Sequence, residues 1–88
     1  MIDTKDAVRI ALEHMREMYD ERQIPGLSLE EIELTKDRAS WMVTVSFTKT
    51  APKSPIEAMT SQHGSTTYKV LAIDAESGLV LSMKTRAV

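Results

Sequence analysis

Apolar residues recur at three- and four-residue spacing near the start of the chain, a pattern typical of a helix with one buried face. These positions are Val8, Ala11, Leu12, Met15, Met18 and Tyr19. The pattern predicts one amphipathic helix over residues 4–22. Asp3 or Thr4 can cap its start, and Asp6 falls in the first turn, where the helix dipole favours a negative charge. Proline and glycine in residues 24–26 are expected to end it.

Four later segments alternate apolar and polar side chains, as strands with one face on a core do. The predicted strands are residues 27–34, 40–48, 67–73 and 79–85. The second is the clearest, and its apolar positions are Trp41, Val43, Val45 and Phe47. The first is also compatible with a short helical turn.

Two short polar segments predict the turns that join these strands into hairpins. Residues 35–39 read as a polar loop. In the second turn, Asp74 can accept hydrogen bonds from the backbone amides that follow it, and Gly78 can take the left-handed conformation that closes the loop. This turn and its apolar flanks predict an antiparallel hairpin.

Residues 49–66 differ from the rest because they are rich in Pro, Ser and Thr and hold few apolar residues. A connection of this length is uncommon in a compact domain and is usually functional or disordered. The sequence therefore predicts a long exposed loop that could bind a partner. Its candidate contact residues are Pro52, Lys53, Pro55, Ile56, Met59 and His63.

The predicted elements indicate an α+β fold, in which one N-terminal helix packs on an antiparallel sheet of about four strands joined by hairpins. One helix can cover only one face of such a sheet, yet apolar residues occur on both faces of the last two strands. These residues include Leu71, Ile73, Leu79, Leu81 and Met83. Self-association through the second face would cover them, so a homodimer is one expected arrangement. Trp41 and Tyr68 could be interface anchors, but their positions in alternating runs favour packing beneath the helix.

The helix sequence DAVRIALEHM, the strand WMVTVSF and the hairpin YKVLAIDAESGLVL resemble PepSY-type domains, which are small α+β units of peptidase propeptides and related bacterial proteins. That family's closing hairpin commonly reads Val-Asp-Ala-x-Thr-Gly-x-Val, and residues 73–80 read Ile-Asp-Ala-Glu-Ser-Gly-Leu-Val. The resemblance implies a PepSY- or cystatin-like fold and a binding or inhibitory role, without catalytic residues. Three departures from it are expected within residues 1–88: no export signal, a long loop at 49–66, and no accompanying peptidase.

Composition narrows the class of protein further. The 88 residues are expected to form a single domain, 1–88, and without cysteine there are no disulfides or thiolate ligands. Residues 1–44 carry ten acidic and six basic side chains, whereas residues 45–88 carry three acidic and five basic. No run of Lys or Arg accompanies the few aromatic residues, so nucleic-acid binding is not expected. No stretch approaches the ~20 apolar residues of a membrane span, so we expect a soluble cytoplasmic protein without membrane contact.

Candidate catalytic and metal-binding residues are sparse. His14 falls within the predicted helix and His63 within the loop, without the spacing of paired metal ligands. Glu31 and Glu33 would share one strand face and Glu30 the other, as on a solvated strand edge. The sequence has no nucleophile elbow, P-loop or dinucleotide fingerprint. We therefore expect no catalytic residues, cofactor or metal, and methionines that fill the core.

The leading hypothesis is a small protein-binding or regulatory module without catalytic activity. Such a module could inhibit its protein partner. An alternative is a small-ligand carrier or enzyme with a pocket between helix and sheet. That pocket would be lined by Met15, Tyr19, Trp41 and Phe47. A third hypothesis is an accessory structural subunit of a larger complex.

Overall fold

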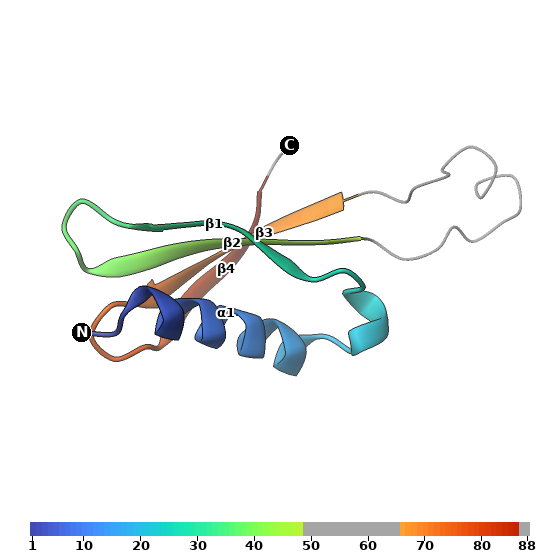
Figure 1. The fold of residues 1–88 in the computed structure, drawn as a ribbon, viewed down its shortest axis with the longest axis horizontal. Helices are drawn as coiled ribbons and strands as arrows, with labels where there is room; N and C mark the ends of the chain where they lie inside the picture. Colours follow the sequence, from blue (N-terminus) through green and yellow to red (C-terminus); the bar gives the residue numbers. More distant parts are fainter. Residues whose placement is uncertain (49–65, 87–88) are drawn as a thin grey trace, which may run out of the picture.

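The computed structural model describes residues 1–48 and 66–86 and has an α+β fold (Figure 1). A helix and a short 3-10 helix precede four strands. The elements are α1 (Thr4–Met18), η1 (Glu21–Gln23), β1 (Ser28–Leu34), β2 (Ser40–Thr48), β3 (Thr66–Asp74) and β4 (Val80–Arg86). The sheet is antiparallel with the order β1-β2-β3-β4, and α1 packs along one of its faces. The predicted fold class is confirmed.

The start of α1 is closed by two reciprocal hydrogen bonds. The Asp6 amide donates to Asp3 Oδ1 at 2.8 Å, and the Asp3 amide donates to Asp6 Oδ2 at 3.4 Å. This capping box satisfies backbone donors that the first helical turn cannot pair internally. Asp3 is thus the cap, one of the two residues that the sequence offered.

The end of α1 lies four residues earlier than predicted. The helix stops at Met18, and Tyr19 is extended, with φ −131° and ψ 146°. Asp20 then caps η1, because its carboxylate accepts from the Arg22 amide at 3.2 Å while Gln23 Oε1 accepts from the Asp20 amide at 2.9 Å. The side chains of Asp20 and Gln23 therefore begin a new helical turn instead of continuing the first.

The buried stripe of α1 is narrower than the sequence pattern suggested. Ala7, Ala11 and Met15, four residues apart, are fully buried. Of the other predicted positions, Met18 is 58 % exposed, so its assignment to the buried face was wrong. Small alanine side chains let the helix axis approach the sheet closely, and only the central row is then fully covered.

The core lies between α1 and one face of the sheet. Its members from the strands and the η1 end are Ile24, Val43, Val45, Phe47, Leu71 and Ile73. Trp41 packs against this cluster, and its Nε1 donates to the carbonyl oxygen of Ile2 at 3.2 Å. Tyr68 is an odd number of positions away from buried Leu71 and Ile73 along β3, so its side chain lies on the opposite face of the sheet. The expected place beneath the helix was therefore right for Trp41 and wrong for Tyr68.

Strand boundaries differ from the prediction by one residue in places. Thr66, which was placed in the loop, begins β3, and Leu79 precedes β4 with 65 % of its surface exposed. A register shift in β4 places Val80 opposite Ile73, although simple alternation had put Val80 on the other face from Met83. A bulge adds one residue to one strand and thereby breaks the alternation. The rest of the predicted loop, with its six candidate contact residues, lies outside the described residues.

The turn from Asp74 to Gly78 has the predicted chemistry. Asp74 Oδ2 accepts from the Ser77 amide at 2.7 Å, the Ser77 hydroxyl at 2.8 Å and the Glu76 amide at 3.2 Å, and Gly78 has φ +77°. The bonds from Ser77, and then that from Glu76, hold the pKa of Asp74 below its usual value. The Thr35 hydroxyl, at 2.6 Å, and then the Ala39 amide lower the pKa of Asp37 in the same way.

Candidate functional site

The sheet presents a second face on the side away from α1. Along β2 and β3, its residues alternate with Val43, Val45, Leu71 and Ile73, which point into the core. We name this side the distal face. It comprises Glu31 and Glu33 from β1, Met42, Thr44 and Ser46 from β2, Tyr68, Val70 and Ala72 from β3, and Ser82, Lys84 and Arg86 from β4.

Glu30 also reaches the distal face. The register of β1 and β2 shifts between Leu29 and Glu31, which leaves Glu30 as the extra residue of a bulge. Its Oε1 accepts from the hydroxyl of Ser46 at 2.6 Å. The prediction that Glu30 lies on the other face from Glu31 and Glu33 was therefore wrong, and all three carboxylates gather beside one face.

Charge is separated across the distal face. The β1 edge carries the three glutamates, and the β4 edge carries Lys84 and Arg86. Arg86 Nη1 lies 3.7 Å from Glu31 Oε2, although β2 and β3 separate their strands. The two long side chains therefore reach toward each other across the distal face. Both side chains keep about half of their surface exposed, at 51 % and 55 %, so the pair is weak.

The centre of the distal face is a row of small and hydroxyl-bearing side chains. Thr44 and Ser46 are only 4 % and 5 % exposed. They are flanked by their register partners Glu31 and Tyr68. The Ser46 hydroxyl is paired with Glu30 and also lies 3.2 Å from the Ser28 hydroxyl. Beside them, Met42, Val70 and Ala72 add half-buried apolar surface.

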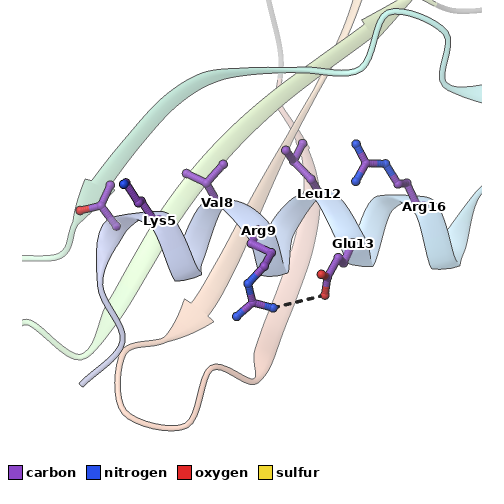
Figure 2. A pocket seen from close by; sticks show the side chains of 7 residues that line it. Lys5, Val8, Arg9, Leu12, Glu13 and Arg16 are labelled. Atoms are coloured by element: carbon purple, nitrogen blue, oxygen red, sulfur yellow. Dashed lines mark ion pairs between the residues drawn. The ribbon is translucent and has the colours of Figure 1, made fainter.

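A second surface lies along the exposed flank of α1 (Figure 2). It is an open hollow of about 410 Å³ with Val8 and Leu12 at its centre. Its lining residues are Thr4, Lys5, Val8, Arg9, Leu12, Glu13 and Arg16. Arg9 contacts carboxylates on both neighbouring turns, Asp6 at 3.6 Å and Glu13 at 3.5 Å. The hollow is thus a shallow apolar strip with charged borders, and the sequence had assigned its centre to the core.

The residues expected to line a pocket between helix and sheet instead contact one another and the core. Met15 has no exposed surface, and the rings of Tyr19 and Phe47 lie 6.2 Å apart between centroids. Trp41 is held by its bond to the Ile2 carbonyl. Met15 and Phe47 thus belong to the core, and Tyr19 and Trp41 pack against it.

Titratable side chains do not gather into a recognisable centre in the described ranges 1–48 and 66–86. No group of three or more His, Cys, Asp or Glu residues there is placed to hold a metal ion. His14 is half-buried on α1, and His63 lies outside these ranges. No helix in the described part of the chain is long and apolar enough to cross a membrane.

The distal face was foreseen only as a sheet face that one helix leaves uncovered. The separation of charge on this face was not predicted, although the sequence contains an acidic segment, Glu-Glu-Ile-Glu at 30–33, and a basic segment, Lys-Thr-Arg at 84–86. That signal becomes a pattern only when the strand order places the two segments on opposite edges. Comparison with models of protein families, with curated proteins and with solved structures finds no match. The PepSY resemblance therefore stays a prediction.

Proposed function

We propose that this chain is a small protein-binding module without catalytic activity, and that the distal face is its contact surface. The observation that carries the proposal is the layout of that face. Half-buried apolar side chains at Met42, Val70 and Ala72 lie between an acidic and a basic edge. Apolar surface within a polar and charged rim is the usual anatomy of a protein interface. Regulation, including inhibition, would follow if this face occludes a surface of its partner.

The packing between helix and sheet favours a binding module over a ligand carrier. A carrier needs a concave apolar pocket for its ligand. Here Met15 is fully buried, and the Tyr19 and Phe47 rings pack together in the region where that pocket was predicted. A ligand could enter only by displacing these side chains from the core. The distal face needs no such rearrangement to receive a partner.

A pair of matched substitutions tests the proposed surface. Val70 and Val8 are both half-buried valines, one on the distal face and one on the flank of α1. Val70→Lys places a charge in the centre of the proposed interface, whereas Val8→Lys places the same charge elsewhere. Affinity capture from source-cell lysate identifies partners, and calorimetry with each purified partner measures the dissociation constant. We expect Val70→Lys to weaken binding by ~10-fold or more and Val8→Lys to leave it unchanged.

The opposite result would place the interface on the helix. If Val8→Lys abolished binding while Val70→Lys did not, the flank of α1 would be the contact surface and the proposal would fail. A wild-type chain that captured nothing and did not self-associate would also contradict it. An accessory subunit, the third hypothesis, would use the same face but would not dissociate on dilution.

A further inference from the structure

We infer that the partner of the distal face is a second copy of this chain, docked face to face about a two-fold axis parallel to the strands. The inference rests on the proposed function, because it assigns an occupant to that surface. Its basis is the separation of charge between the two edges. Glu30, Glu31 and Glu33 follow the β1 edge, while Lys84 and Arg86 follow the β4 edge.

The strand order makes this arrangement self-complementary. A 180° rotation about an axis in the interface and parallel to the strands reverses the order β1-β2-β3-β4. The acidic β1 edge of each copy then lies against the basic β4 edge of the other, and β2 lies against β3. A two-fold axis perpendicular to the strands would instead place β1 on β1 and β4 on β4, with like charges opposed. Complementary charge therefore selects the first axis.

The centre of the face is suited to burial. Met42 comes from β2, and Val70 and Ala72 come from β3, so the rotation brings apolar positions of the two copies together. The buried hydroxyl of Ser46 already donates to Glu30 at 2.6 Å. Covering it with a second copy leaves no new unpaired donor there, so its burial carries little cost.

The ion pair between Arg86 and Glu31 is available for exchange. Its two side chains are about half exposed, and the atoms lie 3.7 Å apart, so the pair holds each partner loosely. In the dimer, Arg86 of each copy can turn to the carboxylates of the other copy. The exchange replaces two weak internal contacts, one in each chain, with two intermolecular contacts, so the number of ion pairs is unchanged.

The size of the face sets the strength of the dimer. Four strands at a spacing of about 4.8 Å pair over about seven residues at about 3.3 Å each, the length of the two edge strands, which gives a footprint of roughly 440 Å². A standard interface buries about 800 Å² per partner. The footprint is about half of that, so we expect a reversible dimer with a dissociation constant in the micromolar range, weakened by salt.

A charge-swap experiment tests the axis directly. The variant Glu31→Lys/Glu33→Lys makes both edges basic, and the variant Lys84→Glu/Arg86→Glu makes both edges acidic. Each variant should dimerise at least ~10-fold more weakly than the wild type in sedimentation equilibrium from about 1 to 500 µM. An equimolar mixture should form a heterodimer at least as tight as the wild-type dimer, because every edge again meets its opposite charge. Native mass spectrometry distinguishes the heterodimer by mass.

A matched control for the Lys84→Glu/Arg86→Glu variant carries the same change in charge on another surface. Lys5→Glu/Arg16→Glu reverses two exposed basic residues on the flank of α1 and should leave dimerisation unchanged. Circular dichroism of each variant checks that it folds. Recovery in the mixture is itself evidence of folding, because two unfolded chains would not restore each other. Leu81→Lys provides a second control, since Leu81 is 57 % exposed in β4, where edge-to-edge pairing would place it in the contact.

Three outcomes overturn the inference. If the wild-type chain is monomeric throughout the concentration range, the inferred dimer does not exist. If Val70→Lys nevertheless abolishes binding of another protein, the proposed function stands without the dimer. A dimer that ignores both charge reversals but is lost in Leu81→Lys places the contact at the sheet edge. A mixture that fails to associate more tightly than either variant excludes the axis parallel to the strands.

Discussion

The two faces of the sheet bury their central residues by different means. On the covered face, Val43 and Val45 have no exposed surface and belong to the core that α1 closes. Thr44 and Ser46 alternate with them on the distal face and are almost as buried, at 4 % and 5 %, although α1 lies on the other side. On the distal face, side chains of the neighbouring strands provide the cover.

This difference separates a face that holds the fold together from a face that is free to exchange contacts. Apolar burial under a helix is strong and is not screened by salt, as interactions between charges are. On the distal face, the closing contacts are a hydroxyl–carboxylate bond and a half-exposed ion pair between Arg86 and Glu31. Such contacts contribute little net stability and can be replaced by those of a partner.

Truncation of two adjacent residues on opposite faces should show the largest difference in stability between the two faces. Leu71 is fully buried on the covered face, and Val70 is half-buried on the distal face. Leu71→Ala should lower the free energy of unfolding by about 2–5 kcal/mol, because it removes core contacts and leaves a cavity. Val70→Ala should cost about 1 kcal/mol or less. Urea denaturation of both variants measures the difference, and equal losses would show that the distal face is also a structural core.

The contact between the closing turn and α1 should give the next largest effect. A Cβ at Gly78 would lie 3.1 Å from Ile10 Cδ1, and its φ of +77° disfavours any side chain. Gly78→Ala should therefore cost about 1–3 kcal/mol. Gly26→Ala is the matched control, because Gly26 has φ +71° but its nearest neighbour would be Thr48 Oγ1 at 3.7 Å. Thermal unfolding should show a larger loss for Gly78→Ala, and equal losses would assign the whole effect to the backbone.

Removal of the buried hydroxyl on the distal face should have a smaller effect. Ser46→Ala deletes the 2.6 Å bond to Glu30 and should lower the free energy of unfolding by about 1 kcal/mol. Glu30→Gln keeps an acceptor oxygen in place and should cost less. Chemical denaturation at one fixed pH compares the two variants. A larger loss in Glu30→Gln would show that the charge, and not the hydrogen bond, stabilises this site.

The pair that joins the two edges should contribute less still. A double-mutant cycle with Glu31→Gln and Arg86→Gln should give a coupling free energy below about 1 kcal/mol, because both side chains are half exposed. The coupling should shrink further in about 1 M salt, where screening is strong. A coupling that persisted at high salt would mean that the pair is more buried in solution, and the distal face less free to exchange contacts.

Acid should act on the turns at one end of the sheet, with the smallest effect. Hydrogen bonds lower the pKa of Asp37 and Asp74 from the usual 3.8, so the unfolded chain binds protons more readily than the folded chain. The resulting stabilisation is complete above the unfolded pKa and disappears as the pH falls through the folded pKa. Melting temperatures between about pH 2 and pH 7 should fall less in Asp37→Asn/Asp74→Asn than in the wild type. An identical acid profile would contradict this account.

Much of the fold followed from local sequence signals. The role of Asp74 as acceptor and the left-handed Gly78 were predicted correctly, because the hydrogen bonds of this turn join residues within four positions of each other. The helix was foreseen, but its end was not, because Asp20 can pair either with the preceding helix or with a new turn. Glu30 was assigned to the wrong face because a bulge depends on how the strand pairs with its neighbour. Tyr68 was assigned to the wrong face because the sequence does not show which side of the sheet the helix covers.

Local signals specify the kinds of element, their order and the turn from Asp74 to Gly78, because periodicity, caps and glycine conformations act over a few residues. The folded chain adds which sheet face α1 covers, where the bulges fall, and the contact of Glu31 with Arg86 across two intervening strands. These features depend on register between segments up to 55 positions apart along the chain, and no local preference specifies that register. The acidic and basic residues of the distal face therefore lie in two distant segments of the sequence, and they form one surface only when the sheet forms.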